Sequence, residues 1–214
     1  WLLQSYGGSI QQGLYEIGLR LGMVSLLITM SLQNIFWKEI AEAKEKGDFE
    51  RMRVLYRKAS RFLFAVGIFI AGFLAPWSKE IIRLVLGPSY MEGSLVLVVM
   101  FIYAAFRSLG ILNSSMLLAG SKPKVHVTFS TIFMIISIPT SYLVLAPIDA
   151  QLPGLQLGSL GLAIKTLVVA ISQSSVVSWW ICRDYGWKFD WIYQLIVLSF
   201  ALSFGWLSFE LVQS

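Results

Sequence analysis

Long apolar stretches separated by short polar segments occupy most of the chain. The six stretches cover residues 14–37, 59–77, 94–119, 125–147, 158–182 and 191–211. About 20 apolar residues are enough for an α-helix to cross the roughly 30 Å hydrocarbon core of a bilayer. The stretches are continuous and do not alternate with period two, which excludes a transmembrane β-barrel. The pattern predicts an all-α, polytopic transmembrane helical bundle of about six spans.

The polar segment between the first two stretches, residues 38–60, contains signals for a helical hairpin. Glu42 and Lys46 are spaced i,i+4, which suits an ion pair on one helix face. Gly47 followed by Asp48 is typical of a helix end and the N-cap of a new helix. We therefore expect two helices that extend from the membrane into water and break at Gly47–Asp48. Pro76 is expected to end the second of them.

The basic residues are distributed unevenly among the five connections between stretches. Twelve of the seventeen Lys and Arg lie in the first, third and fifth connections, whereas the second and fourth together contain two. Basic loops stay in the cytoplasm. The sequence thus predicts cytoplasmic positions for Gly47, Lys122 and Lys188, and outer positions for Pro88 and Gly154. Both ends of the chain would then lie outside, which favours further sequence on either side.

The composition is typical of a protein that is surrounded by lipid. Hydrophobic residues make up 57% of the chain, charged residues 14%, and the mean hydropathy is +0.71, against about 25% charged residues in soluble domains. The net charge of +5 comes from basic residues in the connections, where they orient a membrane protein. It therefore predicts no nucleic-acid partner. One cysteine, Cys182, and one histidine, His126, exclude an intrachain disulfide, a thiolate cluster and a multi-histidine metal site. The sequence predicts no metal and no cofactor.

Three isolated cations lie inside the apolar stretches: Arg20, Arg107 and Lys165. Arg107 is about 18–20 Å from either end of its stretch at 1.5 Å per residue, too deep to reach the headgroups easily. A cation at this depth usually faces a bundle interior or an aqueous cavity. Arg107 is therefore the leading candidate for binding an anionic substrate, with a purely structural pairing as the alternative.

The other two cations have simpler alternatives. Arg20 lies one helical turn from Glu16, so that an intrahelical pair explains both residues. Glu16 is also a candidate for coupling transport to Na⁺ or H⁺. Lys165 lies seven residues into its stretch, where it either lines a cavity or extends to the outer headgroups.

Two further residues are candidates for the lining or hinge of a cavity. Pro139 interrupts the stretch at 125–147 near its middle, and interrupted spans often mark transporter sites. Prolines are also common in ordinary membrane helices. Asn113 is a second candidate, with helix packing as its alternative. A polar band at 172–175 is more typical of a helix interface than of a substrate path.

Three segments resemble one family. Residues 13–59 begin with G-x-Y and end in a charged turn centred on Gly-Asp; residues 81–94 form an apolar segment ending in Gly, followed shortly by Tyr; residues 152–165 contain a Gly-rich G-x-x-G-L-A pattern. In this order they are similar to the polysaccharide (O-antigen) flippase branch of the multidrug/oligosaccharidyl-lipid/polysaccharide exporter superfamily. The resemblance implies that residues 1–214 are the C-terminal lobe of a two-lobe exporter, with the N-terminal lobe absent.

The resemblance also implies a function. The protein would flip a lipid-linked (undecaprenyl-pyrophosphate) oligosaccharide across the bacterial inner membrane by alternating access, with the bilayer, this substrate and the N-terminal lobe as partners. The alternatives are a multidrug or cation exporter of the same superfamily, and a non-transporting scaffold for polysaccharide assembly. A membrane enzyme is disfavoured, because the sequence contains no nucleophile–base pair and no large loop that could carry an active site.

Overall fold

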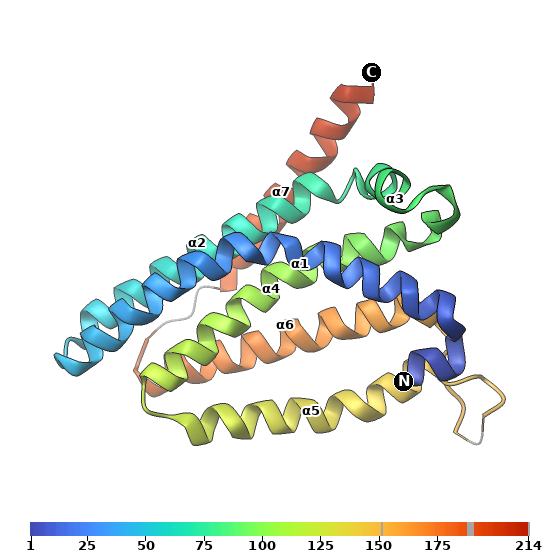
Figure 1. Cartoon of the computed structure of the whole chain (residues 1–214). Coiled ribbons are helices and arrows are strands. Elements are labelled where there is room, and N and C mark those ends of the chain that lie inside the picture. Colours follow the sequence, from blue (N-terminus) through green and yellow to red (C-terminus); the bar gives the residue numbers. More distant parts are fainter. Residues whose placement is uncertain (151, 188–190, 214) are drawn as a thin grey trace.

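The computed structural model describes residues 1–150, 152–187 and 191–213, and all secondary structure in these ranges is helical (Figure 1). The elements are α1 (Leu2–Glu45), α2 (Phe49–Leu74), α3 (Ser78–Leu86), the 3₁₀-helix η1 (Pro88–Gly93), α4 (Ser94–Ala119), α5 (Pro123–Leu145), α6 (Gly158–Asp184) and α7 (Trp191–Gln213). The all-α prediction is confirmed.

Three of these helical segments are long and apolar enough to cross a membrane: Pro88–Ala119, Pro123–Leu145 and Gly158–Asp184. Helices α2 and α3 together make a fourth if they are counted as one span bent by 74°. The stretches at 14–37 and 191–211 are also helical, within α1 and α7, but their assignment as spans stays a prediction. The described part of the chain thus has three helices, or up to four, with the length and apolarity needed to cross a membrane, which suggests a membrane protein.

The hairpin between α1 and α2 has the geometry that its sequence predicts. Helix α1 ends at Glu45, and Gly47 follows with a φ of 68°, a conformation that glycine adopts without steric cost. The side chain of Asp48 caps α2 by accepting a hydrogen bond of 2.9 Å from the backbone N–H of Arg51. The predicted helix break is confirmed.

An ion pair also forms where the i,i+4 spacing predicts one. Lys46 donates to Glu42 at 2.5 Å, and this bond holds the pKa of the Glu42 carboxyl below its ordinary value. Both side chains are largely exposed to water, so the pair contributes little to stability. The i,i+4 spacing of the two residues was sufficient to predict this ion pair.

The first part of the chain is kinked, whereas the helix around Pro139 is not interrupted. Helix α1 departs from helical geometry at Gly8, whose φ is 77° and ψ is 177°. Helix α5 continues through Pro139 without ending, so the expected interruption of this stretch is wrong. Proline removes the one backbone donor that would bond to the carbonyl of residue 135. The hydroxyls of Thr140 and Ser141 donate to the carbonyls of Ile136 and Ser137, and the helix continues without the lost bond.

Helix α4 lies at the centre of the bundle and packs against α1, α2 and α6 (Figure 1). Helix α5 packs mainly on α6, and α7 packs on α2. Gly22 on α1 allows the closest approach to α4: a Cβ at this position would lie 2.9 Å from backbone atoms of Met100. Small residues at such crossings let membrane helices approach closely.

The first and third connections and the described beginning of the fifth, residues 185–187, lie at one end of the bundle, and the second and fourth lie at the other (Figure 1). Lys44 from the first connection donates to the Ser121 hydroxyl of the third at 2.8 Å. Lys122 pairs with Asp184 at the end of α6. The predicted alternation of basic and non-basic ends is therefore present in the fold. Lys188, predicted to face the cytoplasm, lies outside the described residues.

Candidate functional site: a basic groove between α4, α5 and α6

Two cavities, of about 330 and 340 Å³, open between α4, α5 and α6 and meet at Arg107, Ala170 and Gln173. We call the continuous space the basic groove. It is lined by Phe106, Arg107, Gly110, Asn113, Ser114, Leu117, His126, Phe129, Ser130, Ala170, Gln173, Ser174 and Val177 in one cavity, and by Tyr15, Tyr103, Arg107, Ser137, Ser141, Leu162, Lys165, Thr166, Val169, Ala170 and Gln173 in the other.

Arg107 occupies the junction of the two cavities. It lies midway along α4, a helix of 26 residues and thus about 39 Å long. The side chain is exposed on the surface of the bundle. Within the described part of the chain it makes no hydrogen bond or ion pair. The prediction that Arg107 lines a cavity at mid-depth agrees with this geometry, and a structural pairing within the described chain is absent.

Lys165 enters the same groove from α6 and is held by α5. Its ammonium donates hydrogen bonds to the hydroxyls of Ser137 and Ser141, the latter at 2.9 Å. The two serines are one helical turn apart and therefore lie on the same face of α5. Lys165 is half-buried, so its charge is directed into the bundle and away from the outer headgroups.

The groove continues toward the non-basic end through a third cavity of about 380 Å³. This cavity shares Tyr15, Ser141 and Leu162 with the groove and is also lined by Glu16. The hydroxyl of Tyr15 hydrogen-bonds that of Thr166 at 3.2 Å, which links α1 to α6 at the junction. Glu16 is thus adjacent to the groove but outside its two main cavities.

Arg20 is not among the residues that line these three cavities. Its guanidinium is 3.4 Å from the Glu16 carboxylate, and the Arg20 side chain is 80% exposed. The structure therefore has the intrahelical pair that the i,i+4 spacing suggests. Of the three cations selected from the sequence, it brings Arg107 and Lys165 together and leaves Arg20 apart.

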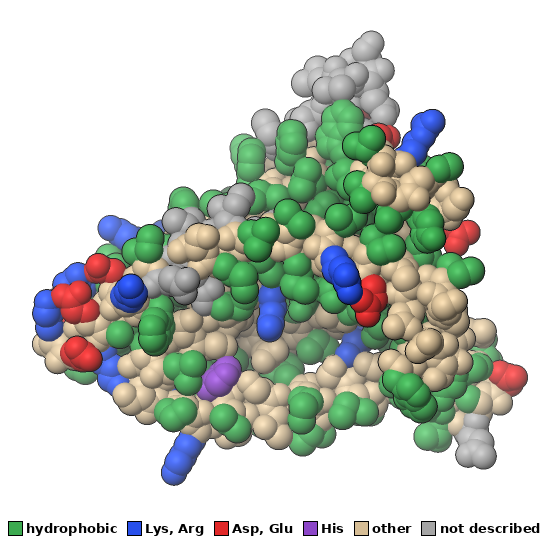
Figure 2. All heavy atoms as spheres, viewed as in Figure 1, with side chains coloured by type: hydrophobic (Ala, Val, Ile, Leu, Met, Phe, Trp, Pro, Cys, Tyr) green, Lys and Arg blue, Asp and Glu red, His purple; other side chains and the backbone are tan. Residues whose placement is uncertain are grey.

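The charge of the groove is entirely positive. Arg107 and Lys165 line it and no Asp or Glu does, among the residues that the structure describes. In Figure 2, Lys and Arg side chains lie around the hollow on the face between α1, α4 and α5, and an acidic side chain lies beside one of them at the edge. Since an isolated charge is costly at membrane depth, this arrangement favours an anionic ligand that neutralises the two cations.

Asn113 lies at the back of the groove and has a packing role. Tyr56 on α2 donates to the Asn113 side-chain carbonyl at 2.7 Å, while the Asn113 amide donates to the Ser174 carbonyl at 3.0 Å and to the Ser178 hydroxyl at 2.9 Å on α6. The residue is 2% exposed. Its polar atoms are thus occupied by three protein partners, as expected for the packing alternative. The other candidate for the cavity, Pro139, is exposed and does not line the groove.

Tyr103 and Gly110 line the groove but were not selected from the sequence, although they lie at i−4 and i+3 relative to Arg107 and so share its helix face. The polar band at 172–175 was interpreted as a helix interface, yet two of its residues, Gln173 and Ser174, line the groove. Gln173 lies two turns beyond Lys165 on the same face of α6. Helical spacing from each cation was the signal that could have found these residues.

Comparison with family models, with curated proteins and with solved structures finds no match for this chain. In the described part of the chain no group of His, Cys, Asp and Glu is placed to hold a metal ion. The groove is therefore the structural feature of this chain that bears most directly on its function.

Proposed function

We propose that the chain is one lobe of a two-lobe transporter that moves a lipid-linked oligosaccharide, carried on undecaprenyl pyrophosphate, across the bacterial inner membrane. The observation that carries the proposal is that two cations, Arg107 and Lys165, line one groove without a carboxylate. A pyrophosphate linkage is a compact dianion that both cations could contact. The resemblance of three sequence segments to the flippase branch supports the same substrate class.

The groove supplies different chemistry to the two parts of such a substrate. The planar guanidinium of Arg107 suits bidentate hydrogen bonds to phosphate oxygens. Serine, threonine and tyrosine hydroxyls and the Gln173 amide line the same space and could hydrogen-bond sugar hydroxyls. Lys165 contributes a second positive charge, held at a fixed depth by Ser137 and Ser141. The lipid tail would remain in the bilayer beside the exposed face of α5.

The proposed mechanism is alternating access between this lobe and a second one. Six spans in this chain, including those proposed within α1 and α7, would pack against the second lobe around the substrate. The basic end would face the cytoplasm, where the lipid-linked glycan is assembled. Glu16 remains a candidate for coupling to Na⁺ or H⁺, because it lines the cavity next to the groove.

Deletion of the gene in its native host tests this function. The deletion strain is expected to lose surface polysaccharide and to accumulate the lipid-linked glycan on the cytoplasmic side, and a plasmid copy is expected to restore export. Resistance to cationic drugs should stay unchanged, since the groove contains no carboxylate to bind a cation. Normal surface polysaccharide in the deletion strain, or a drug-sensitive strain with normal polysaccharide, would refute the proposal.

A further inference from the structure

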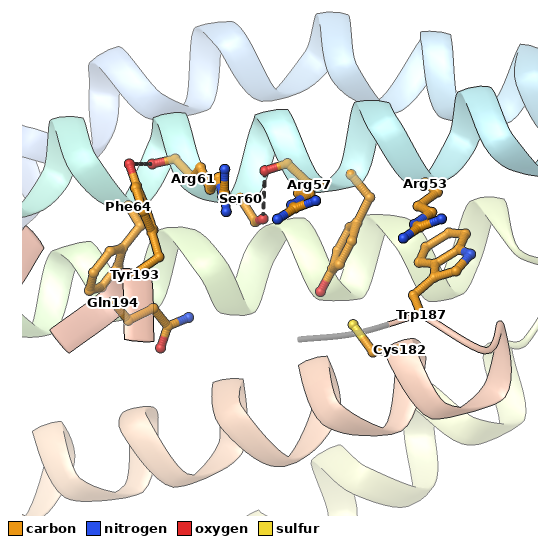
Figure 3. Close-up of a pocket in the computed structure, with 10 residues that line it drawn as sticks. Arg53, Arg57, Ser60, Arg61, Phe64, Cys182, Trp187, Tyr193 and Gln194 are labelled. Atoms are coloured by element: carbon orange, nitrogen blue, oxygen red, sulfur yellow. Dashed lines mark hydrogen bonds between the residues drawn. The ribbon is translucent and has the colours of Figure 1, made fainter. Parts of the chain in front are cut away.

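Helix α3 (Ser78–Leu86) turns sharply away from the direction of α2. A break that contains Pro76 separates the two helices, and they are bent by 74°. Helix α2 is held against α7 before the bend, where the hydroxyl of Tyr193 donates to the Arg61 carbonyl at 3.2 Å (Figure 3). In Figure 1, α2 runs across the picture while α3 is seen almost along its axis. Helix α3 therefore lies across one end of the bundle and does not continue along it.

One side of α3 attaches the helix to the bundle. Ile82 is 1% exposed and packs with Ala71 of α2 and with Leu97 and Phe101 of α4. Gly93, at the end of η1, lies close to the same side chain: a Cβ there would be 3.4 Å from Ile82. These contacts fix the rotation of α3 about its own axis. The other sides of the helix therefore have defined directions.

The rest of the α3 surface has a polar side and an apolar side. Successive residues of a helix are about 100° apart, so Lys79 and Arg83 lie on one side, and Leu84 and Val85 lie on another. All four are exposed, Leu84 to 88% and Val85 to 55%. Glu80 lies at the border between the two sides. A helix with charged and apolar residues on separate exposed sides is typical of the boundary between water and lipid.

The position of α3 in the chain agrees with such a boundary. The apolar part of α2, residues 62–74, ends just before the bend, and α4, which is apolar and long enough to cross a membrane, begins at Ser94. Tyr90 in η1 is 40% exposed, and tyrosine concentrates at membrane–water interfaces. Contact of Leu84 and Val85 with water is unfavourable, whereas contact with acyl chains is not.

We propose that α3 is an interfacial helix that lies in the plane of the membrane at the non-basic end of the bundle. Leu84 and Val85 insert among the acyl chains of that leaflet, and Lys79 and Arg83 lie among the headgroups. In this position α3 holds the adjoining ends of α2 and α4 at a fixed depth. The inference requires that the chain is in a membrane, and it does not depend on the transport proposed above.

The test measures the depth of nitroxide labels on α3 in the purified chain, reconstituted into vesicles of phosphatidylethanolamine and phosphatidylglycerol. The labels are attached to Leu84→Cys and Val85→Cys on the apolar side, and to Arg83→Cys on the polar side as the matched control. Power-saturation electron paramagnetic resonance compares the collisions of each label with oxygen, which concentrates in hydrocarbon, and with a water-soluble nickel chelate. We expect a severalfold higher ratio of oxygen to nickel collisions at 84 and 85 than at 83.

The unsubstituted chain, treated with the same label, gives the background from Cys182, which is buried. Circular dichroism and yield establish that each variant folds, and the use of both 84 and 85 keeps the test valid if one of them does not.

Three results would overturn the proposal. Frequent nickel collisions at all three positions would place α3 in water. Frequent oxygen collisions with few nickel collisions at all three would place the whole helix in the hydrocarbon core, as part of a bent span. Protection of 84 and 85 from both reagents would show that protein covers the apolar side, and in this purified sample that protein is a second copy of the chain.

Discussion

Export of the lipid-linked glycan is expected to fall at least about tenfold when Arg107 is replaced by alanine, because the groove then loses a charge-assisted contact of roughly 1.5–3 kcal/mol. The substitution should leave the protein in the membrane, since the side chain is exposed and makes no hydrogen bond or ion pair within the described chain. The measurement is surface polysaccharide in a flippase-null strain, normalised to the amount of protein in the membrane.

Two further variants separate charge, geometry and position. Arg107→Lys retains the charge without the planar fork and should restore part of the export if phosphate is held bidentately. Arg20→Ala removes an arginine of helix α1 that lies outside the groove and pairs with Glu16, and this variant should export normally. Full export by Arg107→Ala, or a loss accounted for by missing protein, would remove the binding role. Loss of export in Arg20→Ala at normal protein levels would indicate that the substrate path lies along the exposed face of α1.

Asn113→Ala is expected to lower stability by about 2 kcal/mol without a specific effect on transport. The substitution leaves the buried hydroxyl of Tyr56 without its acceptor and removes the contacts of α4 with Ser174 and Ser178 on α6. An unsatisfied buried group costs about 1–3 kcal/mol, although hydrogen bonds between membrane helices average only about 0.6 kcal/mol. The measurement is the thermal unfolding midpoint of the purified protein in detergent.

Ser114→Ala is the matched control for Asn113→Ala. Ser114 is the next residue on α4, lines the groove, and donates only to the Gly110 carbonyl of its own helix, at 2.9 Å. Its replacement should leave the unfolding midpoint unchanged within about one degree. An unchanged midpoint for Asn113→Ala, or an equal decrease in both variants, would contradict the packing role. Loss of export by Asn113→Ala at normal stability would show that Asn113 acts in the substrate path.

The parts of the fold that sequence predicted are those determined by neighbours in the chain. The break at Gly47–Asp48 depends on one positive φ and one capping side chain, and the Glu16–Arg20 pair depends on i,i+4 spacing; both follow from local geometry. The basic connections lie at the same end of the bundle because consecutive helices run in opposite directions, which places every second connection at one end. Even among local features, Pro139 was misjudged, because a membrane helix can continue through a proline.

The groove required information that is not local. Its two cations come from α4 and α6, separated by 58 positions in the sequence, and only the packing of both helices with α5 brings them to one cavity. Sequence identified Arg107 and Lys165 from the cost of charge in lipid but could not determine which neighbours each would meet. The same is true of Asn113, whose three partners lie on α2 and α6. A polar residue deep in a span is equally suited to a cavity or a helix junction until the packing is known.

Site-specific photo-crosslinking from position 173 tests the central claim most directly, because Gln173 lines both cavities of the basic groove. A benzoylphenylalanine at 173, in cells that assemble the lipid-linked glycan, should yield an adduct on illumination that carries the glycan and disappears when its synthesis is blocked. The same group at position 168 on α6, where Val168 is 54% exposed and outside the groove, should yield none. Absence of a glycan adduct at 173, or an equal adduct at 168, would contradict the assignment of the groove as the substrate path.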